Sequence, residues 1–172
     1  MSVPRFVGRF LAVFALLVII GGAVGLTRGY AAVLQGAAAL TSPAVSDWWL
    51  EEREGVRGPE IWLRRGSQEL RFALSMEKLG LGLYPLLSLL LATPGLGWKR
   101  SATNLAIAVA SLFALDLVVV LAYPWLVVPG AVNDITGTFL GLLTFVGAPV
   151  ILWFALTFSR LRGVWRLGGN GS

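Results

Sequence analysis

The sequence predicts an all-α membrane protein with four transmembrane helices and a small extracytoplasmic helix plus β-hairpin between helices 1 and 2. Three observations lead to this fold class. The 172 residues are 56% hydrophobic and only 13% charged, whereas soluble domains carry about 25% charged residues. Four apolar runs approach or exceed the roughly 20 residues that cross a bilayer. A polar segment with the pattern of a hairpin separates the first run from the second.

The apolar runs set the expected boundaries of the transmembrane helices. We expect these helices at about 10–34, 79–98, 103–128 and 136–158. They form a single integral membrane domain over residues 1–172, and residues 41–76 form an extracytoplasmic helix and hairpin module. The runs at 103–128 and 136–158 are the clearest, because they are long and carry few charges.

Basic residues lie beside these runs and predict their orientation. Arg5 and Arg9 precede the first run, Lys99 and Arg100 lie between the second and third, and three arginines follow the fourth, namely Arg160, Arg162 and Arg166. Positive residues favour the cytoplasmic side of a membrane. The sequence therefore predicts a multi-pass membrane protein with both termini in the cytoplasm.

The first run allows a second interpretation. Arg5 and Arg9 followed by Phe10–Ile20 also fit the opening of a signal peptide, with a poor cleavage site at Ala23–Val24–Gly25. Against cleavage, the run is long, and its glycines at four-residue spacing are typical of closely packed membrane helices. Candidate helix-packing residues are Gly21, Gly25, Gly29, Gly137 and Gly141. The plainer interpretation is that glycine is frequent in membrane helices in general.

The segment between the first and second runs predicts a helix followed by a hairpin. Ser42–Pro43 suits the start of a short helix, and Ser46–Arg53 is expected to lie in the headgroup layer through Trp48 and Trp49. Two alternating stretches then flank Gly66–Ser67, a pair that suits a two-residue type II′ turn.

The hairpin has a specific predicted register. It pairs Arg65 with Gln68, Arg64 with Glu69, Leu63 with Leu70, Trp62 with Arg71 and Ile61 with Phe72. One face then becomes apolar, and the other carries an ion pair and a cation–π contact. Because a lone hairpin is marginal in water, its apolar face must rest on the membrane, on the tryptophan helix or on another protein.

Asp116 is the only ionisable residue deep inside a predicted span. Such residues are costly in lipid and usually face a bundle interior or a partner. One interpretation is a proton or cation site, or a contact to a partner's arginine. The other is a structural, protonated carboxyl that is hydrogen-bonded to Ser111, Asn104 or a backbone carbonyl.

Composition excludes several function classes. The chain contains no cysteine and no histidine, so thiol and imidazole catalysis and His- or Cys-held metals are excluded. No nucleotide-binding glycine loop or nucleophile elbow is present. The net charge of +5 is assigned to lipid headgroups and topology, with no nucleic-acid partner. We expect no enzymatic activity, no catalytic residue, no metal site and no cofactor.

The second run and its flanks resemble a known family. The order is Leu70–Arg71–Phe72, then a leucine-rich helix reading YPLLSLLLATPG from Tyr84 to Gly95, then Trp98–Lys99–Arg100 and a further span. Over roughly residues 60–125 this is similar to the small membrane proteins associated with exosortases, especially the H-type system of Gram-negative bacteria. Exosortases use Cys, Arg and His, so the resemblance implies an accessory partner in protein sorting and not the enzyme.

The missing catalytic groups and the external module predict a non-enzymatic accessory subunit of a membrane complex. The resemblance implies that this complex lies in the bacterial inner membrane and that the subunit assists an exosortase-type sorting system. The alternative is a small oligomeric transporter or channel that uses Asp116. The expected partners are the lipid bilayer and a larger membrane protein, such as an exosortase. Candidate contacts to a partner or an ion are Asp116, Trp48, Trp49, Ile61, Trp62, Leu63, Leu70 and Phe72.

Overall fold

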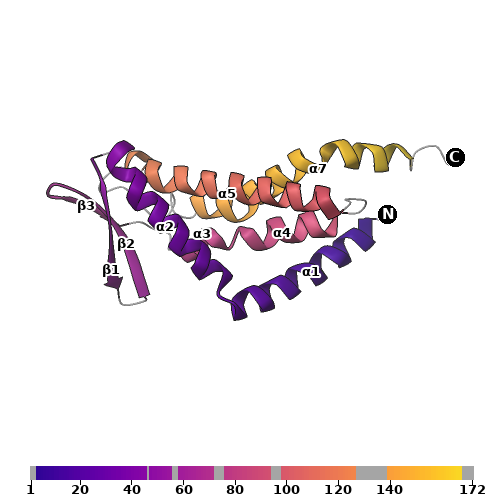
Figure 1. Ribbon diagram of the computed structural model, residues 1–172, viewed down its shortest axis with the longest axis horizontal. Coiled ribbons are helices and arrows are strands. Elements are labelled where there is room, and N and C mark those ends of the chain that lie inside the picture. The colour runs from indigo at the N-terminus through magenta and orange to yellow at the C-terminus, as the bar shows by residue number, and fades with distance from the viewer. Residues whose placement is uncertain are drawn as a thin grey trace.

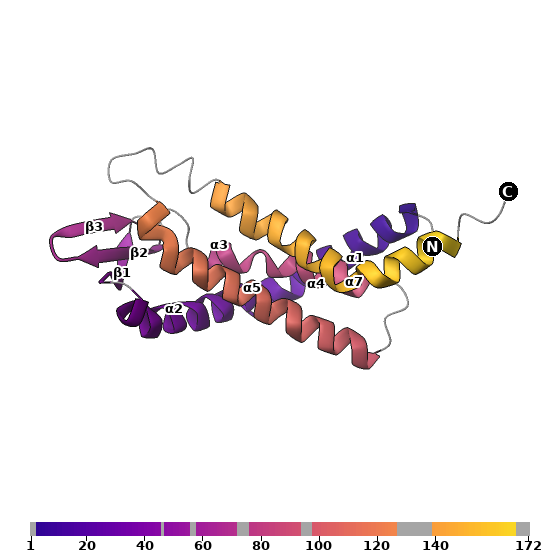
Figure 2. The same cartoon turned by 90° about the horizontal axis from the view of Figure 1, so that it is seen from above.

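The computed structural model describes residues 3–45, 47–55, 58–71, 76–93, 98–126 and 139–167. The molecule is elongated, with helices along the long axis and a small sheet at one end (Figures 1 and 2). The start of the first helix and the end of the last lie together at the opposite end (Figure 1). In chain order the elements are α1 Val3–Ala23, α2 Leu26–Val45, β1 Trp49–Gly55, β2 Gly58–Arg65, β3 Gln68–Arg71, α3 Met76–Gly80, α4 Leu83–Ala92, α5 Trp98–Leu126, η1 Leu143–Gly147 and α7 Ala148–Leu167.

Three described helices are long and apolar enough to cross a membrane. They are Pro4–Ala23, Ser101–Trp125 and Phe139–Phe158, while Lys78–Ala92 is a shorter apolar stretch. This part of the structure agrees with the mostly helical membrane protein that the sequence predicts. Only 6% of the Pro4–Ala23 segment is buried, so most of α1 presents apolar side chains outward.

The first predicted span is two helices and not one. α1 ends at Ala23 and α2 begins at Leu26, and Gly25 between them has a φ of +69°. A left-handed residue after the last helical turn stops a helix, and glycine adopts that conformation without a steric penalty. Gly25, expected to pack helices, instead lies at the bend where α2 turns away from α1 (Figure 1).

The second predicted span is also interrupted. The chain forms α3 and α4 with a break at Leu81–Gly82, where the expectation was one helix over 79–98. Pro85 explains the break, since a proline ring clashes with the carbonyl four residues earlier, here that of Leu81. The amide of Leu81 bonds to the Lys78 carbonyl, and that of Gly82 to the Leu79 carbonyl. Each of these bonds spans only three residues, so the turns at the break are tighter than α-helix.

Close backbone packing fixes this break against η1. A Cβ added at Gly82 would lie 2.6 Å from the carbonyl oxygen of Thr144. Thr144 belongs to η1, a π-helical segment just before Pro149. Proline has no N–H to give to the carbonyl four residues earlier, and π turns accommodate such interruptions. Two interrupted helices therefore meet at their irregular positions.

The external segment forms a three-stranded antiparallel sheet in the order β1-β2-β3. The hairpin of β2 and β3 has the predicted register for the four pairs from Trp62–Arg71 to Arg65–Gln68; the fifth pair involves Phe72, which lies outside the described residues. Gly66 has a φ of +57° and Ser67 has no positive φ, as a type II′ turn requires.

The predicted interfacial helix at Ser46–Arg53 was wrong. α2 continues through Pro43 to Val45, and Trp49–Gly55 is strand β1, which pairs Leu50 with Leu63 and Glu51 with Trp62. The adjacent tryptophans suggested one membrane-facing surface, but in a strand neighbouring side chains point to opposite faces. The edge of the hairpin strand β2 offers hydrogen-bonding groups, and the segment Trp49–Gly55 pairs with it as a third strand.

The buried residues form two clusters along the bundle. One lies between the sheet, α2, α3 and α5 and includes Leu34, Leu63, Leu79, Val120 and Tyr123. The other joins α4, α5 and α7 through Leu86, Leu90, Leu112 and Ala148. The apolar side of the sheet therefore rests on the ends of this chain's own helices.

Candidate functional site

The outer face of the sheet is the first candidate site. Paired residues on adjacent strands point to the same side of a sheet, which puts Trp49, Glu51, Arg53, Trp62, Arg64 and Glu69 together. We call these six residues the outer face. Trp49 is 64% exposed, so a large apolar ring is presented to the surroundings beside charged groups.

Arg53 connects the two edge strands across this outer face. Its guanidinium carbon lies 5.1 Å from the centre of the Trp62 ring. Its Nη2 donates to Glu69 Oε1 at 2.8 Å and to Glu51 Oε2 at 2.9 Å. The predicted Arg64–Glu69 pair is present but longer, at 3.9 Å. The main ion pair therefore runs from β1 to β3 over the tryptophan of β2.

These ion pairs also shift the acid–base properties of the outer face. Hydrogen bonds from Arg53 hold the pKa of Glu51 and that of Glu69 below their ordinary value of 4.5. The same bonds raise the pKa of the Arg53 guanidinium. Both glutamates therefore stay charged to a lower pH than a free glutamate does, and the outer face carries charges of both signs.

The inner face of the sheet is apolar and buried. Leu63 is 2% exposed and packs into the cluster with Trp48, while Leu50 packs against its margin. Trp48 and Trp49 thus have opposite environments despite being neighbours. Of the other predicted contacts, Ile61 and Leu70 lie in β2 and β3, where only their backbone is described, and Phe72 lies outside the described residues.

Asp116 is the second candidate site, and it lies in the bundle core. Its side chain is fully buried (0% exposed), on α5. The hydroxyl of Tyr30 on α2 donates to its Oδ2 at 2.6 Å. Phe113 lies one turn earlier on α5 and contacts the Tyr30 ring edge-on, with centroids 5.7 Å apart. Asp116 therefore joins α2 to α5, two helices far apart in sequence.

The second oxygen of this carboxyl has no hydrogen-bond partner among the described residues. A buried polar atom without a partner is rare and costly. Tyr30 is the partner that sequence reasoning missed, since the candidates were Ser111, Asn104 and the backbone. The available signal was a lone tyrosine within the first apolar region, because buried tyrosines usually donate their hydroxyl to an acceptor.

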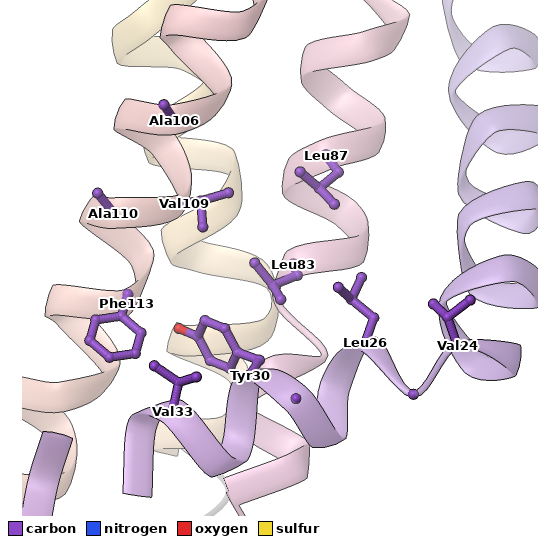
Figure 3. Close-up of a pocket in the computed structure, with 12 residues that line it drawn as sticks. Val24, Leu26, Tyr30, Val33, Leu83, Leu87, Ala106, Val109, Ala110 and Phe113 are labelled. Carbon is purple, nitrogen blue, oxygen red and sulfur yellow. The ribbon is translucent and has the colours of Figure 1, made fainter. Parts of the chain in front are cut away.

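A pocket opens at the bend between α1 and α2 (Figure 3). Its volume is about 740 Å³. Figure 3 shows side chains of α4 and α5 facing it, with α2 and the bend alongside. The lining residues are Val24, Gly25, Leu26, Gly29, Tyr30, Val33, Leu83, Leu87, Ala106, Val109, Ala110 and Phe113.

The predicted packing glycines occupy different environments. A Cβ at Gly21 would lie 2.6 Å from the Tyr84 ring, so α1 and α4 approach closely there. Gly25 and Gly29 line the pocket and have open space around them. Gly141 lies in the helical turn before η1, and Gly137 falls outside the described residues.

Comparisons with family models, curated proteins and solved structures find no match to this chain. Within the described ranges, no group of three or more Asp or Glu residues could hold a metal ion. The outer face, the buried carboxyl and the pocket are the features of this chain that bear on its function.

Proposed function

We propose that this protein is a non-enzymatic accessory subunit of a bacterial inner-membrane complex, and that it contacts a larger membrane protein through the outer face. The observation that carries this proposal is that the outer face presents tryptophan and arginine side chains and that the sheet beneath them is held against the helices. Two tryptophans and two arginines face outward on a sheet whose opposite side is buried against the bundle. Tryptophan and arginine are enriched among residues that dominate binding energies at protein interfaces.

The charges on the outer face indicate the charge pattern of the partner surface that would bind there. The described members contribute two arginines and two glutamates, and Arg53 pairs with both Glu51 and Glu69. Such a surface is complementary to an extracytoplasmic protein surface that also carries both signs. The resemblance to exosortase-associated proteins makes an exosortase the first partner to test.

The proposed topology has four crossings, both termini in the cytoplasm and the sheet outside. It is supported by the arrangement of the ends, since α1 begins and α7 ends at one end of the molecule and the sheet lies at the other (Figure 1). The short helices α3 and α4 would make the second crossing together. The chain has no native cysteine, so a single introduced cysteine reports its own side of the membrane.

Cysteine labelling tests this topology. An impermeant maleimide added to spheroplasts is expected to label Ser67→Cys before lysis, and to label Ser2→Cys only after lysis. Equal labelling of both positions before lysis would overturn the proposed orientation.

Site-directed crosslinking tests the docking surface itself. A photo-crosslinking amino acid at position 49 is expected to capture one larger membrane protein in native membranes. The matched control places the same residue at position 67, at the exposed hairpin tip, where we expect no such product. Crosslinks from position 49 to other copies of this chain alone would refute the accessory-subunit proposal.

A small oligomeric transporter or channel is the second candidate. The buried Asp116 favours it, because one of its oxygens has no partner among the described residues and intramembrane acids often mark ion pathways. Asp116→Asn separates the two candidates. Ion flux that is present in the parent protein and lost in Asp116→Asn, with assembly intact, supports transport. An absence of ion flux in the parent protein refutes the transporter candidate, and the fully buried Asp116 then has a structural role.

A further inference from the structure

The pocket at the α1–α2 bend has an almost entirely apolar lining. Eleven of its twelve lining residues have no polar side chain, and the twelfth is Tyr30. The Tyr30 hydroxyl is already donated to Asp116. A bound molecule would therefore meet mainly hydrocarbon and aromatic surface, which favours an apolar group over a charged one as the part that enters.

The size of the pocket distinguishes between apolar occupants. An α-helix is about 10–12 Å wide with a pitch of 5.4 Å, so a volume of 740 Å³ holds only roughly one and a half of its turns. A partner's transmembrane helix has about 20 residues and would leave most of its length outside. An extended hydrocarbon chain is much narrower, and the volume lies within the roughly 300–1,000 Å³ of small-molecule sites.

The pocket is also continuous with the surface that would face lipid. Val24 and Val33 belong to its lining and are 73% and 64% exposed. Ile107, next to the lining residue Ala106 on α5, is exposed as well. Within the proposed membrane placement, the molecules that reach this opening are bilayer lipids.

Small residues keep the pocket open from two sides. Gly25 at the bend and Gly29 on α2 are four residues apart, as are Ala106 and Ala110 on α5. A Cβ at Gly29 would meet no atom within 4 Å, so larger side chains there would extend into free space. The bend at Gly25 directs α1 away from α5, which leaves this space unfilled by the chain's own helices (Figure 3).

We propose that this pocket binds one acyl chain of a bilayer phospholipid. The bound chain fills the space under the bend and packs on Leu87, Val109 and Phe113, while its headgroup remains outside the pocket. This inference rests on the membrane placement proposed above, and the experiment below separates a failure of that placement from a failure of the pocket.

The test uses the full-length protein in phosphatidylcholine vesicles that contain phosphatidylcholine with a diazirine at the acyl tail. Photolysis and peptide mapping are expected to place adducts on α4 and α5 residues that line the pocket. Gly29→Leu should lower these pocket adducts several-fold, because the leucine side chain occupies the space that the acyl tail would fill. Ala110→Leu is a second filling variant in case the first does not fold.

Matched controls lie on the same helices. Gly36→Leu places the same side chain on α2 at another open position, and Ala114→Leu does so on α5 outside the pocket. Both should retain parental pocket adducts. Adducts on the exposed face of α1, such as at Leu11, report membrane insertion independently of the pocket.

Three other outcomes would refute either the acyl-chain site or the membrane placement. Pocket adducts that do not change in either filling variant would refute the acyl-chain site while α1 labelling still supports membrane placement. An absence of labelling on α1 as well would refute the placement. A dimer that dissociates in Gly29→Leu but not in Gly36→Leu would show that a second copy occupies the pocket.

Discussion

The outer face and the bundle core each contain a polar pair with a short contact, but their surroundings differ. Arg53 and Glu69 meet at 2.8 Å with about a third of each side chain exposed. Tyr30 and Asp116 meet at 2.6 Å, and the aspartate is fully buried. Solvent weakens the first pair and replaces its partners when it breaks, whereas nothing in the core replaces a lost partner. Similar distances therefore imply different costs of disruption.

The same comparison shows that the outer charges do not hold the sheet in place. The sheet is attached through its inner face, where Leu63 is almost completely buried among helix residues. Burial of apolar side chains dominates such attachments. A substitution is therefore expected to cost more stability the more deeply the replaced side chain is buried.

The largest effect is expected for Leu63→Asp. Replacing a buried leucine by alanine costs about 2–5 kcal/mol of unfolding free energy, and burying an unpaired charge adds to that cost. The sheet should detach, so trypsin should cut faster at the exposed Arg64 and Arg65. Ser67→Asp introduces the same charge at the hairpin tip and should leave cleavage unchanged. Unaltered protease protection in Leu63→Asp would show that the inner face does not hold the sheet.

Gly82→Ala should have the next largest effect and extends the comparison to backbone packing. Gly82 has ordinary right-handed dihedrals, so the penalty is steric and comes from the nearby Thr144 carbonyl. Overpacking of this kind costs about 1–3 kcal/mol, measurable by unfolding in detergent micelles. Gly36→Ala has open space and should be neutral or stabilising. Equal stability of the two variants would mean that α3–α4 and η1 are not held together there.

Tyr30→Phe should have a smaller effect, which tests the core pair directly. Hydrogen bonds between membrane helices contribute about 0.6 kcal/mol on average and up to about 1.7 kcal/mol. A double-mutant cycle with Asp116→Leu should give a coupling energy in that range, because both single variants leave a buried group unpaired. Tyr84→Phe, on another buried tyrosine, is the control. A coupling energy of zero would contradict the role of this pair in joining α2 to α5.

The smallest effect is expected for Glu69→Gln on the outer face. The pKa of Glu69 is lowered in the folded protein, so its stabilising contribution is present above the ordinary value of 4.5 and is lost as the pH falls through the lowered value. The variant should be nearly as stable as the parent at neutral pH and should show a weaker loss of stability on acidification. A larger loss than for Tyr30→Phe would reverse the order of the two regions.

Some features were predictable because local sequence determines them. Composition and apolar run length predicted a mostly helical chain, and three of the described helices are long and apolar enough to cross a bilayer. Gly66–Ser67 and the alternating residues on either side gave the hairpin and its register. Periodicity and turn chemistry act over a few residues, so they are visible in the sequence itself.

Other features depended on contacts between distant segments. β1 became a strand because β2 offered an edge to pair with, and Trp48 was separated from Trp49 by the alternation of that strand. Arg53 reached Glu69 only because three strands lie side by side. The Gly25 break was readable in principle, but an apolar run conceals it when length is the main criterion.

The sequence by itself determined that the chain is apolar, helical and without cysteine or histidine, since these follow from residue identity. Tertiary structure decided that Asp116 would meet Tyr30, 86 positions away in sequence, and that a pocket would open at the bend beside α4 and α5. The physical reason is that hydrogen-bond partners and empty space depend on how separate helices pack, and that packing is a sum over many weak contacts which no single segment contains.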